Sequence, residues 1–303
     1  MNIVIKVNDE IKEKMIEYYK DKKRDKVIPY VVFQAEEEDT VITLYESGKC
    51  MFQGKSADVD AAMWGVAIEN TKENKDKKKD EYKKYYESSS VGSDEVGTGD
   101  YFGPIVVTAA YVNKKDIKKL EELGVGDSKK IDDSKIKKIA PELTKIVKYR
   151  SLIINNKEYN EQYNIYKNLN KIKAIMHNKV LYQLIHEENL KPDYIIVDEF
   201  AREAKYYEYI NEDPNMQKGI TFITKAEDIS LAVASASIIS RYIFLKEFDK
   251  LSDELHIPLL KGASRDVDKV GKEVVEKYGI DKLKEIAKFD FHNTERIINT
   301  GLD

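Results

Sequence analysis

One stretch carries more functional information than the rest of this chain, Gly92-Ser93-Asp94-Glu95-Val96-Gly97-Thr98-Gly99-Asp100-Tyr101-Phe102-Gly103-Pro104. Two adjacent carboxylates precede a glycine-rich turn, and a strand-like apolar run, Ile105 to Val112, follows it directly. Neighbouring carboxylates repel each other, and glycines inside a strand cost backbone entropy. A divalent cation held by the carboxylates, with a polyanion approaching the glycine backbone, explains both features.

Two familiar phosphate-binding motifs do not fit this turn. Gly97, Gly99 and Gly103 are similar to a dinucleotide fingerprint, but that motif needs a helix immediately after the turn, and a β-branched run follows here. The turn also contains no Gly-Lys-Ser or Gly-Lys-Thr, so a P-loop of the Walker type is excluded at this position.

Composition limits the class of protein without identifying it. The chain has 303 residues, and Lys+Arg 51 nearly balances Asp+Glu 55, so the formal charge of −4 says little about partners. Cys50 is the single cysteine, which excludes a disulfide framework and a thiolate metal cluster. No apolar run reaches the length of a membrane span, and the N-terminus lacks the apolar core of a signal peptide. We expect a cytoplasmic protein that does not enter membranes.

The chain divides into three parts by composition. Residues 1–70 alternate strand-like and helical patterns, with a hairpin turn at Ser47-Gly48 and a closing helix at 57–68, and predict a small α+β domain. Residues 71–90 are rich in Lys and poor in aliphatic side chains, which is typical of a linker. Residues 91–303 form the third part.

The third part predicts an α/β fold. Strands flank the glycine turn and recur at 151–154 and 194–197, and helical patterns cover 115–123, 133–147, 169–185 and 229–248. The apolar run Tyr194 to Val197 is typical of a buried parallel strand. The pattern therefore predicts a mixed sheet with helices on both faces.

Further acids lie at the ends of predicted strands and helices, where they can contact a ligand. Asp198 directly follows a buried strand, where α/β sheets place ligands, although Glu199 is equally acidic and a turn or cap also explains Asp198. Glu227 precedes the long helix, where the helix dipole alone accounts for an acid. Together with Asp94 and Glu95, these acids suit Mg²⁺ or Mn²⁺, and such a set can hold two ions for phosphodiester cleavage. None of the four histidines is predicted to be catalytic.

A lysine-containing loop is a second candidate for phosphate contact. Asp127 or Ser128 can cap the helix that follows, while Lys129 and Lys130 can meet phosphates as point charges. A capped loop with solvated lysines explains the same residues.

The signature at Gly92–Pro104 resembles that of bacterial ribonuclease HIII, within the ribonuclease HII/HIII family. The resemblance continues through Asp127–Lys130, Asn168–Ala174, Val197–Phe200, Lys225–Glu227, Ala234–Tyr242 and Phe291–Thr294. It implies a ribonuclease H-like fold and an endonuclease that cuts the RNA strand of RNA–DNA hybrids, leaving 5′-phosphate and 3′-hydroxyl ends. Its metal-site acids correspond to Asp94, Glu95, Asp198 and Glu227. Thr98 and Glu227 favour type HIII, because type HII usually has Arg and Asp there.

The resemblance also implies how substrate is held. The backbone around Gly97, Thr98 and Gly99 would read the ribose 2′-hydroxyl, with Ser128 and Lys129 as further contacts. Residues 1–70 resemble the TATA-binding-protein-like domain of type HIII enzymes through Tyr45, Gly48, Lys49, Phe52, Gln53 and Gly54. We expect a monomer that uses Mg²⁺ or Mn²⁺, two ions during catalysis. Type HII behaviour, a hybrid-binding protein without turnover and a DNA-directed nuclease remain alternatives. The preferred metal, the cleavage position and the nucleic-acid face of the first domain stay open.

Overall fold

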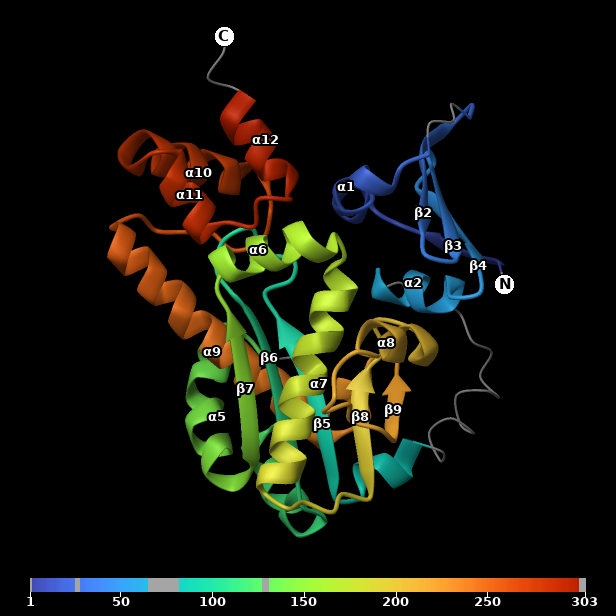
Figure 1. Ribbon diagram of the computed structural model, residues 1–303, viewed down its shortest axis with the longest axis vertical. Helices are drawn as coiled ribbons and strands as arrows, with labels where there is room; N and C mark the ends of the chain where they lie inside the picture. Colours follow the sequence, from blue (N-terminus) through green and yellow to red (C-terminus); the bar gives the residue numbers. More distant parts are fainter. Residues whose placement is uncertain (1, 25–27, 65–81, 127–130, 300–303) are drawn as a thin grey trace. The chain divides into compact units, whose positions relative to one another are not determined.

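The computed structural model describes residues 2–24, 28–64, 82–126 and 131–299 (Figure 1). Its contacts divide the chain into two compact units, residues 1–79 with 199–205, and residues 80–198 with 206–303. Of the predicted linker at 71–90, residues 71–81 lie outside the described part, residues 82–86 are helical, and Ser90 already begins a strand of the second unit.

The described part of residues 1–79 forms an antiparallel sheet with two α-helices. Its strands β1 (Asn2–Lys6), β2 (Val31–Glu37), β3 (Thr40–Tyr45) and β4 (Lys49–Gly54) pair in the order β1-β4-β3-β2. Helix α1 (Asp9–Tyr18) is capped by the side chain of Asn8, and the turn η1 (Lys20–Lys22) follows it. The predicted hairpin at Ser47-Gly48 is confirmed, since it joins β3 to β4. The predicted helix at 57–68 appears as α2 (Ala57–Met63), and residues 65–68 lie outside the described part.

The second unit is built on the predicted mixed sheet. The strands are β5 (Ser90–Val96), β6 (Ile105–Val112), β7 (Lys148–Ile154), β8 (Tyr194–Asp198) and β9 (Ile220–Ile223), in the order β7-β6-β5-β8-β9. Central β5 is antiparallel to β6 and parallel to β8, which is in turn parallel to β9. The carboxyl ends of β5, β8 and β9 therefore lie at one edge of the sheet.

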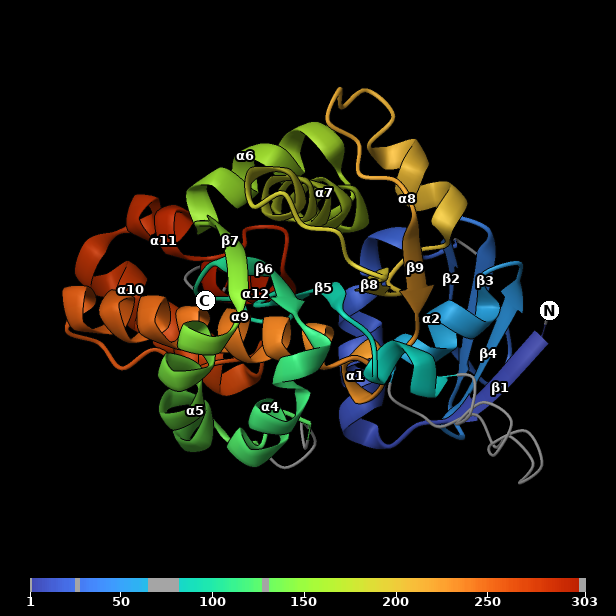
Figure 2. The ribbon, with the colours of Figure 1, turned by 90° about the horizontal axis from the view of Figure 1, so that it is seen from below.

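Helices cover both faces of this sheet, as predicted. Helices α6 (Asn156–Tyr166) and α7 (Leu169–Glu187) lie on one side and α9 (Leu231–Leu255) on the other (Figure 2). The remaining helical elements are η2 (Lys114–Asp116), α4 (Ile117–Leu123), α5 (Asp133–Ile146), α8 (Glu203–Tyr209), η4 (Ala226–Asp228), α10 (Arg265–Tyr278), α11 (Ile280–Ile286) and α12 (His292–Ile298). The long helix begins two residues later than predicted and extends to Leu255, where His256 adopts a left-handed conformation and ends it. Among the described helices, none has the length and apolarity needed to cross a membrane.

Close packing of α9 against β5 explains Gly92. A Cβ atom on Gly92 would lie 2.4 Å from the backbone nitrogen of Val233, so any larger residue would push the helix off the strand. The small residues of α9, including buried Ala232 and Ala236, permit this approach. The strand that carries the adjacent acids is thus held tightly against one helical layer.

Candidate active site

Asp94 and Asp198 lie side by side at the carboxyl ends of two parallel strands. Ser93 of β5 is paired in register with Val197 of β8, and each acid is the next residue in its strand. Neighbouring strands lie about 4.8 Å apart, so the register brings the two carboxylates to the same place. The expectation that Asp198 sits at the end of a buried parallel strand is therefore confirmed.

The two adjacent acids of β5 point to opposite faces of the sheet, because side chains alternate along a strand. Asp94 faces α9, where its carboxylate interacts with Ser237, and the Ser240 hydroxyl donates a 3.2 Å hydrogen bond to the backbone oxygen of Asp94. Glu95 faces α7, where it meets Lys173 and His177. The two helical layers hold the acid pair from both sides.

Both carboxylate oxygens of Glu95 have a partner on α7. Lys173 Nζ lies 2.5 Å from Oε1 and His177 Nε2 lies 2.9 Å from Oε2. The other ring nitrogen of His177 is 2.7 Å from the hydroxyl of Ser93. Ser93 and His177 are fully buried, so this Ser–His–Glu arrangement cannot present a nucleophile to substrate and serves to orient Glu95.

Glu227 reaches the site through a short turn. Lys225 adopts a left-handed conformation with φ of 58°, and η4 follows. The backbone nitrogen of Ala226 donates a 2.9 Å hydrogen bond to Oδ1 of Asp198. Glu227 is then close enough to raise the pKa of Asp198 electrostatically. Neighbouring Glu199, which the sequence left as an alternative to Asp198, pairs with Arg202 at 3.6 Å.

The carboxylates of this cluster are largely buried, so water screens their mutual repulsion poorly. Burial, followed by the charges of Glu95 and Asp198, raises the pKa of Asp94 well above its usual range. Burial, together with Glu227 and Glu95, raises the pKa of Asp198 to about 6. Burial opposes ionisation of Glu95 too, but Lys173 and His177 outweigh it and lower the pKa of Glu95 to about 2. The cluster therefore gathers more negative charge than its protein surroundings neutralise.

These residues suit a divalent cation. Hard carboxylate oxygens are the ligands that Mg²⁺ and Mn²⁺ prefer, and a bound dication would relieve the repulsion that raises the two pKa values. Lys173 already places a cation against Glu95. Within the described residues, no group of three or more His, Cys, Asp or Glu side chains is arranged in advance to hold a metal ion. Glu95 would have to turn from Lys173 for all the acids to share one ion.

The three glycines of the turn are required for different reasons. Gly97 has φ of +96°, and a Cβ atom there would lie 2.1 Å from the backbone oxygen of Pro104. Gly103 also has a positive φ, and its Cβ would press on Phe248. A Cβ on Gly99, in contrast, would have no atom of the described structure within 4 Å. The fold requires glycine at 97 and 103, whereas the space beside Gly99 is open.

The structure thus brings the four predicted acids to one edge of the sheet, while Ser128 and Lys129 lie outside the described residues. Sequence reasoning missed Lys173 and His177. The available signal was their spacing of four residues on one helix, where two polar side chains interrupt an apolar pattern. No sequence pattern indicates that these side chains contact Glu95, because the contact depends on how α7 packs on β5.

A mixed sheet of this order, with acids at the ends of neighbouring parallel strands, defines an α/β protein whose site suits a divalent cation. The family model described as Ribonuclease HII matches residues 91–294, and a domain of unknown function, DUF3378, matches residues 2–78. Ribonuclease HIII of Bacillus cereus is 39% identical over 98% of both chains, and that of Bacillus thuringiensis is 40% identical over 97% of both. The crystal structure of Bst-RNase HIII in complex with Mn²⁺ aligns with 100% of this chain and 99% of its own, at 35% identity and a TM-score of 0.73.

The chain therefore belongs to the ribonuclease HIII family. It is a metal-dependent hydrolase of the ribonuclease H class, and the predicted fold class is confirmed along its length. Ribonuclease H2 of Pyrococcus horikoshii, at 24% identity and a TM-score of 0.60 over 70% of this chain, shares the fold of the second unit.

Proposed function

We propose that this protein hydrolyses the RNA strand of RNA–DNA hybrids at a centre formed by Asp94, Glu95, Asp198 and Glu227. The observation that carries the proposal is the adjacency of Asp94 and Asp198 at the ends of paired parallel strands, with Glu95 and Glu227 acting on the same charges. Products with 5′-phosphate and 3′-hydroxyl ends are expected.

Mg²⁺ or Mn²⁺ at such a site supplies activation of water and stabilisation of the departing 3′-oxygen, with two ions bound during catalysis. The Mn²⁺ complex of the Bst enzyme supports this choice of ion. Asp94 and Asp198 would hold the ions from the ends of β5 and β8. His177 fixes the orientation of Glu95, and the Ala226 backbone N–H fixes that of Asp198.

The substrate would bind beside the four acids. The backbone N–H groups of Gly97, Thr98 and Gly99 would approach the ribose and its phosphate, and the open space at Gly99 supports this assignment. Ser128 and Lys129 would add phosphate contacts. Residues 1–70 would act as a substrate-binding domain. The catalytic domain would take residues 91–303 together with the last residues of the predicted linker at 71–90, since Ser90 begins β5. One chain contributes all four acids, so we propose a monomer as the active form, working in the cytoplasm where hybrids arise in bacteria.

The decisive experiment incubates the protein with a labelled RNA–DNA hybrid, with Mg²⁺, with Mn²⁺ and with neither. Metal-dependent cutting of the RNA strand alone supports the proposal. Binding without cleavage under both ions would instead favour a hybrid-binding protein, and cutting of an all-DNA duplex would favour a DNA-directed nuclease. A duplex with one embedded ribonucleotide distinguishes type HIII from type HII behaviour.

A further inference from the structure

Lys288 is a fully buried lysine whose ammonium group is bonded to the signature turn. Its Nζ donates hydrogen bonds of 2.7 Å to the backbone oxygens of Asp100 and Gly103. Its own backbone nitrogen donates a third, of 2.9 Å, to the oxygen of Tyr101. One residue near the C-terminus thus contacts three of the four residues from 100 to 103.

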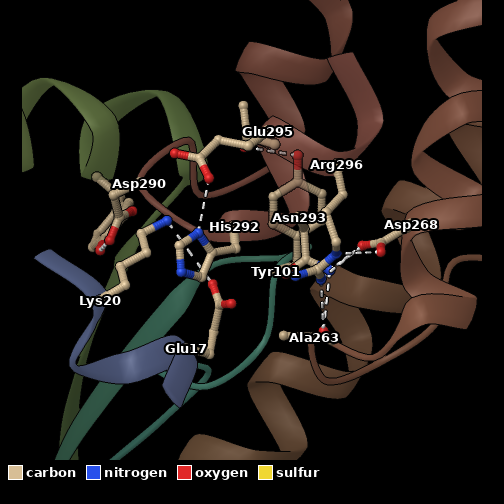
Figure 3. Close-up of polar contacts among 12 residues, drawn as sticks. Glu17, Lys20, Tyr101, Ala263, Asp268, Asp290, His292, Asn293, Glu295 and Arg296 are labelled. Atoms are coloured by element: carbon tan, nitrogen blue, oxygen red, sulfur yellow. Dashed lines mark hydrogen bonds and ion pairs between the residues drawn. The ribbon is translucent and has the colours of Figure 1, made fainter. Parts of the chain in front are cut away.

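Other residues in the last part of the chain also form hydrogen bonds with this turn. The backbone nitrogen of Tyr101 donates to Gly262, and the Tyr101 hydroxyl lies 3.0 Å from the hydroxyl of Thr294. Figure 3 shows Arg296 of α12 reaching Asp268 of α10 beside Tyr101, with an Arg296 Nη2 to Asp268 Oδ1 distance of 3.0 Å. Helix α12 thus contacts the turn through Thr294 and is tied to α10 by the pair of Arg296 and Asp268.

The burial of Lys288 costs free energy that its hydrogen bonds must offset. Burial lowers the pKa of Lys288 to about 8, which reports the cost of removing its charge from water. An apolar side chain of similar length would avoid that cost, but it would leave the carbonyl groups of Asp100 and Gly103 without this donor. The lysine therefore fixes two carbonyl groups of the turn that an apolar side chain would release.

The carbonyl groups of Asp100 and Gly103 belong to the same turn as the backbone N–H groups proposed to contact substrate. The backbone nitrogen of Asp100 donates to the oxygen of Gly97, so residues 97–100 form one closed turn. A displacement of Asp100 would pass directly to Gly99, where an added Cβ atom would meet no described atom within 4 Å.

We propose that Lys288 is a positioning residue for the reaction, which holds the backbone of the signature turn in the place where its N–H groups meet the ribose. The inference rests on the proposed function, because it assumes that the turn contacts substrate. It predicts that removing the ammonium group lowers the rate of cleavage while the protein remains folded.

The test compares Lys288→Met with the wild type in thermal unfolding, hybrid affinity and single-turnover cleavage. Affinity is measured by fluorescence anisotropy with Ca²⁺, and cleavage is measured with enzyme in excess and Mg²⁺. We expect a folded protein with a lower unfolding temperature, because two carbonyl groups lose their donor, and a hybrid affinity within about threefold of the wild type. The single-turnover rate should fall by about 10- to 100-fold, since a misplacement on the order of 1 Å has that effect. Lys284→Met, which removes an exposed lysine of α11, is the matched control and should behave as the wild type.

A wild-type rate in folded Lys288→Met would overturn the inference and leave the proposed function intact. A wild-type protein that cuts no hybrid would overturn both. Lys288→Gln, which keeps an N–H donor on a shorter stem, should show an intermediate rate. If neither Lys288 variant folds, the lysine serves folding and the positioning role is wrong.

Discussion

Glu95 and Lys173 form an ion pair of 2.5 Å within the acid cluster, and their side chains are only 12% and 11% exposed. The pair supplies positive charge at the place where a metal-free protein would otherwise carry several adjacent carboxylates. A metal ion that binds Glu95 must compete with this lysine. We therefore predict that Lys173 weakens metal binding and stabilises the metal-free site.

Lys173→Met should bind Mn²⁺ more tightly than the wild type, by about tenfold, because an opposing cation is removed from a poorly solvated site. Isothermal titration of metal-free protein measures this without any cleavage assay. Lys179→Met removes an exposed lysine from the same helix and serves as the control. Equal or weaker Mn²⁺ binding by Lys173→Met would show that the lysine does not compete with the ion.

Asp198→Asn should abolish cleavage, by at least about a hundredfold, because it removes an ionic ligand and keeps the oxygen that accepts from Ala226. The folded pKa of about 6 lies above the usual value of 3.8, so ionisation costs stability once the pH rises through 6. The metal-free variant should therefore be more stable than the wild type at pH 8, by about 1–3 kcal/mol. Glu199→Gln is the control for the neighbouring acid, and an inactive Glu199→Gln with an active Asp198→Asn would reverse the assignment.

Gly99→Ala should leave the unfolding temperature nearly unchanged and weaken hybrid binding, because the added methyl meets no described atom within 4 Å and enters the space proposed for substrate. Gly97→Ala should instead destabilise the fold by more than about 1 kcal/mol, since it combines a positive φ with a collision against Pro104. Thermal unfolding and fluorescence anisotropy with a labelled hybrid separate the two effects. Unchanged affinity and rate in Gly99→Ala would remove Gly99 from the substrate contacts.

Asp60 of the first unit should make stability depend on pH. Burial, together with Glu37, Glu38 and Asp39, raises the pKa of Asp60 to about 7 from 3.8. The folded state thus retains a proton that the unfolded chain loses, so this stability is complete below about pH 4 and is lost as the pH rises through 7. Asp60→Asn should raise the unfolding temperature at pH 8 and change it little at pH 4. The same gain at both pH values would contradict the assignment.

Deletion of residues 1–70 should weaken hybrid binding far more than it slows cleavage of bound substrate. Loss of a nucleic-acid-binding unit also reduces the number of phosphates neutralised, so the dependence of affinity on salt should become less steep. Binding measured across a salt series and single-turnover rates at saturating enzyme test the two parts separately. An unchanged affinity would exclude the first unit from substrate binding.

Much of this architecture follows from local sequence. The apolar run before Asp198 and the β-branched run after Pro104 both form the strands they predicted, and strand ends then locate the acids. Helix ends were less accurate, because α9 continues to Leu255 while its apolar pattern weakens. The hairpin at Gly48 was predictable, since its positive φ of 77° is one that glycine readily adopts.

Side chains with distant partners were not predictable. Lys288 lies 185 and 188 residues from the carbonyls it binds, and no periodicity links such positions. His177 was predicted not to be catalytic, and its fully buried ring has the structural role of orienting Glu95, a partner that the sequence did not indicate. In each case the partner is set by packing between layers of the fold, which a single sequence does not encode locally.

The alternation of Asp94 and Glu95 across the sheet has a consequence for sequence change. Inserting or deleting one residue between Gly92 and Asp94 would reverse the face of the sheet to which each acid points. The side chain of Asp94 would then point toward Lys173, and that of Glu95 toward Ser237. Each acid would then face a helix whose side chains do not match it, although both acids would still be present. We therefore expect natural length variation in this enzyme to be confined to its loops, with none in the few residues that lead into the acid pair.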